Sequence, residues 1–336
     1  MRIAVLSPIA WRTPPRQYGP WELIASTIAE GLVEEGHDVT LFATADSMTK
    51  GKLDAVCPNP YAENSNLDAK VWECLHISNL MEKSECFDII HNHYDFLPLT
   101  YSKLINTPMV TTIHGFSSEK IVPVYAKYNG SSTYISISNS DRHSQLDYAR
   151  TIYHGIDETT FKFNEYKEDY LLFYGRILPN KGTLEAIQIA QSAGLPIIIA
   201  GLIQDHNYFE SHISSEIDGE NVIYLGNVDQ SVGNDLLGKA KALLHPIFFD
   251  EPFGLSVAEA MMCGTPVIAF SRGSMPELIE DGLTGYLVNS VSEAVQAVRK
   301  LKEIDIYYCR AYAMEKFSIK RMIKEYIEVY KALTIN

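Results

Sequence analysis

Short apolar runs alternate with longer amphipathic stretches along the whole of this chain, and this alternation limits the folds open to it. In the first half, helical patterns such as 21–35 and 68–83 separate apolar runs at residues 3–6, 39–42, 89–90, 110–113, 134–137 and 151–153. Strands that are apolar on both faces and separated by helices indicate a parallel sheet covered by helices on both sides. The first half is therefore predicted to be a doubly wound α/β domain.

The same pattern starts again after a polar segment at 157–169. Its expected strands lie at 171–174, 197–200, 222–225, 242–245, 267–270 and 285–288, and its expected helices include 183–193, 256–263, 292–304 and an amphipathic last helix at 318–333. A chain of 336 residues suits two domains better than one. We expect domains at 1–155 and 156–317, a C-terminal helix within 318–336, and ligands at the carboxyl ends of the strands, in a cleft between the domains.

The charge and the cysteines exclude several classes of partner. The net charge is −14 and neither half is basic, so nucleic acid is not expected, and membrane contact is expected to be peripheral at most. Five widely spaced cysteines without a C-x-x-C pair favour a reducing cytoplasm over a disulfide framework. Residues 1–6 have the pattern of a buried strand rather than a signal peptide, and no apolar run approaches about 18 residues.

Two glutamates separated by seven residues follow the expected strand 242–245. Glu251 comes near the end of that strand, and Gly254 comes where the next helix begins. Free amides at a helix N-terminus suit an anionic or hydroxyl-rich ligand. A purely structural role is an equal alternative for this segment by itself, because Ser256 and Glu259 have the spacing of a capping box.

Two cations, Arg176 and Lys181, lie in one loop between the expected strand 171–174 and the following helix. Arginine offers a planar fork of donors and lysine a point charge, and together they suit a diphosphate. Ordinary surface cations on a solvated loop are the alternative.

Histidines and a glycine follow strands of the first half. His114 ends the expected strand 110–113 and precedes a glycine, which suits a ring that hydrogen-bonds a ligand, although a structural histidine is the alternative. Gly19 precedes the first helix, where amides would meet a phosphate or acceptor, or form only a turn. His91 and His93 share one face of a strand end, but no Cys or Asp is spaced to complete a zinc site, so no metal is expected.

Several common motifs are missing from the sequence. No two aspartates lie two apart, no G-x-G-x-x-G follows the opening strand, and no G-x-S-x-G occurs. A D-x-D metal–nucleotide site, a dinucleotide-dependent dehydrogenase and a serine hydrolase are therefore not favoured.

Taken together and in this order, the segments resemble the retaining nucleotide-sugar glycosyltransferases of family four. The resemblance runs from the segment 18–22 to the final helix, and its most specific part is the E-x7-E pattern from Glu251 to Glu259. The Arg176–Lys181 loop and His114 with its glycine come next, and segments 153–157 and 273–277 are similar to the family's linker and turn. The resemblance implies a GT-B fold, in which two Rossmann-like, doubly wound domains face one another across a cleft. It also implies that the first domain binds the acceptor, that the second binds the nucleotide-sugar donor, and that the C-terminal helix packs back on the first domain.

The resemblance also implies a role for each residue. The donor sugar would meet Glu251 and His114, the ribose Glu259, and the base the backbone at Val228. The diphosphate would meet Arg176 and Lys181, and backbone amides of the donor site would come from Phe253, Gly254 and Leu255. Gly19 would contact phosphate or acceptor, but the family often has a second glycine where this chain has Pro20, which lacks an amide donor.

The implied activity is transfer of a sugar from a UDP-, GDP- or ADP-sugar to an acceptor hydroxyl, with retention of configuration and without metal or other cofactor. The acceptor would be a sugar, a small molecule or a lipid-linked molecule. Alternatives are an epimerase or phosphorylase on the same fold, because fold does not fix reaction, and a non-catalytic protein that binds nucleotide-sugars. A glycoside hydrolase also uses two carboxylates but has no need of two cations at a helix start.

Overall fold

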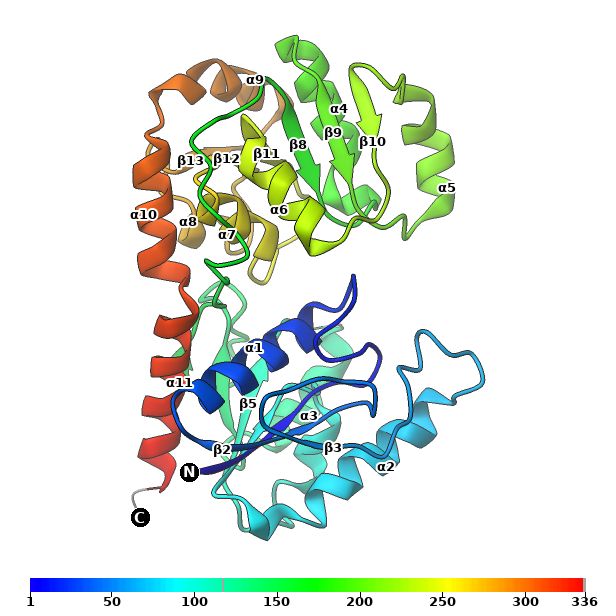
Figure 1. Cartoon of the computed structure of the whole chain (residues 1–336), viewed down its shortest axis with the longest axis vertical. Helices are drawn as coiled ribbons and strands as arrows, with labels where there is room; N and C mark the ends of the chain where they lie inside the picture. Colours follow the sequence, from blue (N-terminus) through cyan, green and yellow to red (C-terminus); the bar gives the residue numbers. More distant parts are fainter. Residues whose placement is uncertain (117, 335–336) are drawn as a thin grey trace. The chain divides into compact units, whose positions relative to one another are not determined.

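The computed structural model describes residues 1–116 and 118–334. The chain forms two compact units (Figure 1). The first unit combines Met1–Gly155 with Ile319–Asn336, and the second is Ile156–Ser318. The C-terminal helix therefore belongs to the first unit, although the whole second unit precedes it in the sequence.

The first unit is built on a parallel sheet of seven strands in the order β3-β2-β1-β4-β5-β6-β7. The strands are β1 (Arg2–Leu6), β2 (Asp38–Phe42), β3 (Lys52–Asp54), β4 (Ile89–Asn92), β5 (Met109–Ile113), β6 (Thr133–Ser136) and β7 (Tyr148–Thr151). Strands β1, β4 and β5 are buried almost throughout, which explains why their sequences are apolar runs.

The longer helices of this unit are α1 (Pro20–Glu34), α2 (Ala69–Met81), α3 (Val122–Lys127) and α11 (Ile319–Thr334). Helix α1 has proline at its first position, where no amide is needed. Helix α2 is capped by Asp68, whose side chain accepts from the Val71 amide. Helix α11 packs beside α1, as Figure 1 shows, with the buried face Met322, Ile323, Tyr326 and Tyr330 turned to the unit.

The second unit has a parallel sheet of six strands in the order β10-β9-β8-β11-β12-β13. The strands are β8 (Leu171–Tyr174), β9 (Ile197–Ala200), β10 (Val222–Tyr224), β11 (Ala242–His245), β12 (Val267–Phe270) and β13 (Gly285–Val288). The order reverses between β8 and β11, which are neighbours in the sheet. Ligands of doubly wound sheets bind at such a reversal.

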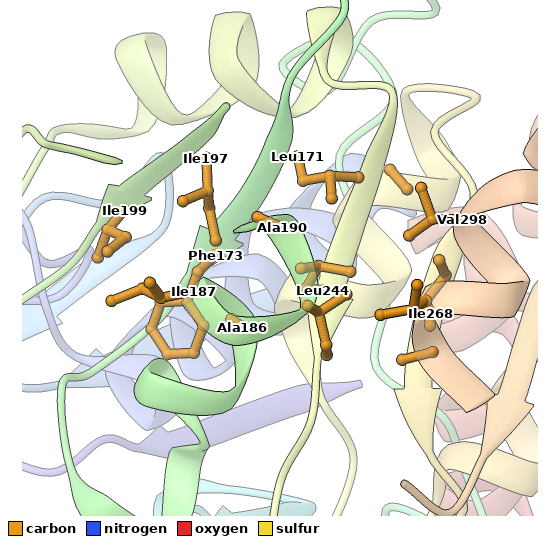
Figure 2. Packing of buried hydrophobic residues seen from close by; sticks show 14 of the residues in the cluster. Leu171, Phe173, Ala186, Ile187, Ala190, Ile197, Ile199, Leu244, Ile268 and Val298 are labelled. Atoms are coloured by element: carbon orange, nitrogen blue, oxygen red, sulfur yellow. The ribbon is translucent and has the colours of Figure 1, made fainter. Parts of the chain in front are cut away.

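The helices of the second unit are α4 (Thr183–Ala193), α5 (His206–Tyr208), α6 (Gln230–Lys239), α7 (Leu255–Met262), α8 (Met275–Leu278), α9 (Val291–Lys300) and α10 (Ile306–Phe317). Figure 2 shows the core on one face of the sheet, where Leu171, Phe173 and Leu244 meet side chains of α4 and α9 such as Ala190 and Val298. The prediction of two doubly wound α/β domains is confirmed. No helix among residues 1–116 and 118–334 has the length and apolar character needed to cross a membrane.

Two predicted elements differ from the structure, and one strand has no counterpart among the predictions. In place of the strand expected at 151–153, the structure has β7 at Tyr148–Thr151, which pairs with β6 across a shift in register. Strand β3 contains no apolar run, so the sequence does not predict it. Both are edge strands, so their side chains are not buried on two faces. The helix expected at 292–304 ends at Lys300, and Asp305 then caps a new helix, α10, by accepting from the amides of Tyr307 and Tyr308.

The backbone at the start of the C-terminal helix passes close to Gly155. A Cβ at this position would lie 2.7 Å from the Cα of Ile319 and 3.0 Å from the Met322 methyl group. We expect Gly155→Ala to lower the free energy of unfolding of this unit by about 1–3 kcal/mol, because backbone at the start of α11 has to move. Urea denaturation followed by tryptophan fluorescence measures this unit alone, since Trp11, Trp21 and Trp72 all belong to it.

The control for this prediction is Lys320→Ala, on the exposed side of the same turn of α11. This variant should unfold within about 0.5 kcal/mol of the unmodified protein. Equal stability of the Gly155 and Lys320 variants would contradict a close contact at residue 155.

Candidate donor site and histidine cluster

The predicted donor residues of the second unit lie at the carboxyl edge of its sheet. Arg176 and Lys181 follow β8, and Glu251 follows β11, the neighbouring strand across the reversal of strand order. The loops also bond directly to each other, because the Phe248 amide donates to the Asn180 carbonyl at 2.8 Å. The fold therefore brings together two segments that are far apart in the sequence.

Lys181 and Glu251 form a close ion pair in this site. Lys181 Nζ lies 2.5 Å from Glu251 Oε2, and the two side chains are only 13% and 14% exposed. His245, the last residue of β11, places Nε2 3.6 Å from the same oxygen. Burial by itself would raise the pKa of Glu251, but the neighbouring His245 and Lys181 side chains outweigh it and lower the pKa to about 2. Glu251 is therefore ionised at neutral pH.

The turn after β12 holds the backbone of Glu251. Gly273 has φ 54°, and a Cβ there would lie 2.3 Å from the Glu251 nitrogen, so only glycine fits without movement. The Ser274 amide donates to the Glu251 carbonyl at 3.0 Å, and the Ser274 hydroxyl donates to the Phe253 carbonyl at 2.6 Å. The segment 273–277, noted in the sequence, thus supports the glutamate loop.

Helix α7 begins directly after this loop. Gly254 is its N-cap with φ 93°, a left-handed conformation that favours glycine. No side chain caps the helix, and Ser256 is its second residue, so the capping-box alternative for Ser256 and Glu259 is wrong. Phe253 is buried against Phe317 and anchors the loop, while Leu255 opens the helix with its first-turn amides.

Glu259 lies inside the unit, on the second turn of α7, and is 7% exposed. Burial raises the pKa of its carboxyl group to about 7. Ionising a buried carboxyl group costs free energy unless a cation or hydrogen-bond donors stabilise the charge. The raised pKa of Glu259 is therefore consistent with a group that accepts hydrogen bonds from a bound ligand.

Arg176 and Val228 lie in two other loops that follow strands of this sheet. Arg176 donates to the side-chain oxygen of Gln204, in the loop after β9, at 2.7 Å. Val228 is partly buried in the loop between β10 and α6. Arg176 thus contacts the loop after β9, whereas Lys181 contacts the glutamate loop.

In the first unit, Gly19 caps α1 and Pro20 is the first residue of that helix. Glu22, in the same first turn, is 3% exposed and accepts from the Trp11 amide at 3.2 Å. Burial raises the pKa of Glu22 to about 7. Acidic residues are common in the first turn of a helix, so the sequence alone does not mark Glu22 as a candidate site residue.

His114 belongs to a cluster of buried histidines at the ends of β4 and β5. His93 Nδ1 lies 2.9 Å from His114 Nε2, and His93 Nε2 lies 3.3 Å from His91 Nδ1. The His114 ring also stacks with Trp21 and His154, at centroid distances of 5.5 and 5.2 Å. Within the described residues, no three His, Cys, Asp or Glu side chains are arranged to hold a metal ion.

Sequence reasoning missed two of these partners. His245 ends β11 directly before a proline, so its position at a strand's carboxyl end was the available signal. His154 was noted only within the segment 153–157. Its stacking on His114 depends on where β5 and the segment after β7 lie in the folded unit, which no local pattern reveals.

Comparison with known proteins identifies the family. A model of the glycosyl transferases group 1 matches residues 156–312, and a model of glycosyltransferase family 4 matches residues 22–160. An uncharacterized glycosyltransferase of Methanocaldococcus jannaschii is 24% identical over 98% of this chain and 98% of its own length.

Solved structures agree in fold. AviGT4, a glycosyltransferase involved in avilamycin A biosynthesis, has a TM-score of 0.73 and 23% identity over 99% of this chain and 98% of its own. Anabaena HepE in complex with UDP and glucose has a TM-score of 0.76 and 19% identity over 99% of this chain and 100% of its own. With the two family matches running from residue 22 to residue 312, the chain belongs to the group 1, family 4 glycosyltransferases and has their GT-B fold.

Proposed function

We propose that this glycosyltransferase moves a sugar from a nucleotide-diphosphate sugar to an acceptor hydroxyl, with retention of configuration and without a metal ion. The observation that carries the proposal is the Lys181–Glu251 pair at the strand-order reversal of the second unit. A fixed cation and a carboxylate that is ionised at neutral pH match the two halves of such a donor, its diphosphate and its sugar hydroxyls. The Anabaena HepE structures with UDP and with UDP-glucose support a uridine nucleotide as the first donor to test.

In the proposed site, Lys181 and Arg176 bind the diphosphate together with the first-turn amides of α7. An ammonium group has three donors, so Lys181 can bond a phosphate oxygen and keep its contact with Glu251. Glu251 accepts from hydroxyls of the sugar, and Glu259 accepts from the ribose hydroxyls. The backbone at Val228 lies against the base.

The reaction breaks the bond from the anomeric carbon to the diphosphate oxygen and forms a bond to the acceptor oxygen. Positive charge develops on the sugar and negative charge on the departing diphosphate, so Lys181, Arg176 and the α7 amides stabilise the leaving group. For retention, the acceptor hydroxyl attacks from the face that the diphosphate leaves, and its proton passes to the departing phosphate oxygen. His114, in the first unit, accepts a hydrogen bond from a substrate hydroxyl.

Binding and turnover test the proposal separately. UDP-, GDP- and ADP-sugars are screened by thermal unfolding, and the correct donor should stabilise the protein by about 2.7 kcal/mol at 100 times its Kd. The stabilising donor is then incubated with sugar, glycerol-type and lipid-linked acceptors, and free nucleotide is measured with and without EDTA. We expect nucleotide release that depends on acceptor and is unaffected by EDTA.

Other results would exclude the proposal in defined ways. Release of nucleotide to water alone indicates a hydrolase, and interconversion of donor sugars without acceptor indicates an epimerase. Stabilisation by a donor without turnover on any acceptor class indicates a binding protein. If EDTA abolished the activity and added magnesium restored it, a metal ion would stabilise the departing diphosphate, which would contradict the metal-independent site proposed for Lys181 and Arg176.

A further inference from the structure

A continuous row of hydrogen bonds connects the C-terminal helix α11 to His114. The Tyr330 hydroxyl lies 2.6 Å from His91 Nδ1, and His93 Nε2 lies 3.3 Å from that same nitrogen. His93 Nδ1 lies 2.9 Å from His114 Nε2. All four side chains are buried. The row therefore runs from a helix more than 200 residues away in sequence to the histidine proposed to meet substrate.

The direction of the first bond follows from Tyr330. At 2.6 Å its distance to His91 Nδ1 suits a hydroxyl donor, whereas ring N–H donors usually lie farther from their acceptors. The Tyr330 hydroxyl has no other hydrogen-bond partner among residues 1–116 and 118–334. Acting as the acceptor, its hydroxyl would leave its own hydrogen buried and unsatisfied, which is unfavourable. Tyr330 therefore donates, and His91 Nδ1 carries no hydrogen.

The remaining bonds then have one possible direction each. Burial lowers the pKa of His91 and His114 to about 3 and also lowers that of His93, so all three rings are neutral at pH 7. A neutral imidazole has one donor nitrogen and one acceptor nitrogen.

His91 therefore carries its hydrogen on Nε2, which donates to Thr112 Oγ1 at 2.8 Å. Since His91 Nδ1 has no hydrogen, the 3.3 Å bond between these nitrogens requires His93 Nε2 to donate, sharing the lone pair that also accepts from Tyr330. His93 Nδ1 is then left as an acceptor. His114 Nε2 must in turn donate to His93 Nδ1.

We infer that Tyr330 is a positioning residue that, through His91 and His93, holds His114 as the tautomer with hydrogen on Nε2 and a bare Nδ1. His114 Nδ1 has no hydrogen-bond partner among the described residues. It is thus the nitrogen free to accept from a substrate hydroxyl, whereas the opposite tautomer would present a hydrogen there and repel the same donor. The inference rests on the proposed function only for what His114 contacts, because its tautomer is a property of the unbound protein.

The test compares two tyrosines of the same helix. Tyr330→Phe removes the hydroxyl that starts the row, whereas Tyr326→Phe removes an equally buried hydroxyl that bonds to Thr112, at 2.8 Å, and leaves Thr112 Oγ1 in place to accept from His91 Nε2. Protein labelled with 15N-histidine is studied by NMR, with the His114 signals assigned by their loss in His114→Gln. We expect a hydrogen-free Nδ1 at His114 in the unmodified protein and in Tyr326→Phe, and a mixture of tautomers in Tyr330→Phe.

Activity gives the second readout. If only the fraction of molecules with a bare Nδ1 is competent, kcat/KM for Tyr330→Phe falls by about two- to tenfold, and Tyr326→Phe stays within about twofold. A hydrogen on Nδ1 in the unmodified protein would overturn the inference, as would equal tautomer spectra for the two variants. Should no donor and acceptor pair support turnover, the proposed function fails, and the NMR comparison still decides the tautomer.

Discussion

Replacing Lys181 by alanine is expected to lower kcat for sugar transfer by roughly 10²–10³-fold, because the departing diphosphate loses a preorganised cation. Glu251→Ala should cause a comparable loss, since the donor sugar loses the acceptor of its hydroxyls and Lys181 loses the partner that holds it in place. Steady-state kinetics with saturating donor measures both losses, and circular dichroism checks that each variant is folded.

The matched control is Lys239→Ala, which removes a lysine that pairs with Asp235 at 2.9 Å on the exposed side of α6. Its kcat should be unchanged, because a surface pair contributes little to stability and nothing to the donor site. The single variants leave one buried charge without its partner and are therefore expected to be less stable, so Lys181→Met combined with Glu251→Gln separates stability from function. This double variant should regain stability without activity. Near-normal turnover by both single alanine variants would remove the basis of the proposed site.

Glu259→Gln is expected to stabilise the second unit at pH 8 while weakening donor binding. Burial raises the pKa of Glu259 from 4.5 to about 7. Between these two values the unfolded chain releases a proton that the folded protein keeps, so stability falls as pH rises from about 4.5 to about 7. The difference of about 2.5 pKa units corresponds to at most roughly 3 kcal/mol. Glutamine carries no proton to release, and the variant escapes this loss.

Urea denaturation followed by circular dichroism at pH 5 and pH 8 measures the effect. The variant should exceed the unmodified protein clearly at pH 8 and only slightly at pH 5, where Glu259 is still neutral in the folded state. Donor affinity should fall by about tenfold or more, the value of a hydrogen bond to a charged group. If the free energy of unfolding of the variant changed between pH 5 and pH 8 as much as that of the unmodified protein, burial of Glu259 would not be the cause of the pH dependence.

The sequence predicts the second unit closely because its four central strands, β8, β9, β11 and β12, are largely buried on both faces. The runs at 171–174, 197–200, 242–245, 267–270 and 285–288 coincide with strands of the structure. In the first unit, β3 and β7 lie at the edges of the sheet, so nothing requires an apolar run, and sequence patterns miss or misplace them. Helix α10 was missed because only Asp305 marks the break from the helical segment before it.

The candidate site shows the same division between local and tertiary information. The segment Glu251–Glu259 could be recognised from residue types and spacing, but its two glutamates behave oppositely in the fold. Glu251 has its pKa lowered by a histidine and a lysine from other segments, and Glu259 has its pKa raised by burial. Likewise, His91 and His93 suggested at most an incomplete zinc site, whereas the structure joins them to His114 and to Tyr330. Except for His245, which ends the strand just before Glu251, these partners come from distant elements and leave no trace in local periodicity.

The discontinuous first unit sets an order on synthesis. A ribosome releases residues 1–155 and then the whole of 156–318 before it makes Ile319–Thr334, the helix that completes the first unit. The second unit is contiguous in sequence and can fold as it leaves the ribosome. Until α11 is made, the surface of the first unit that packs against Met322, Ile323 and Tyr326 stays exposed to solvent. A polypeptide that stops at residue 318 therefore carries a complete second unit and an unfinished first one, with His91 lacking the hydroxyl of Tyr330. The first-made half of this enzyme is the last to be finished.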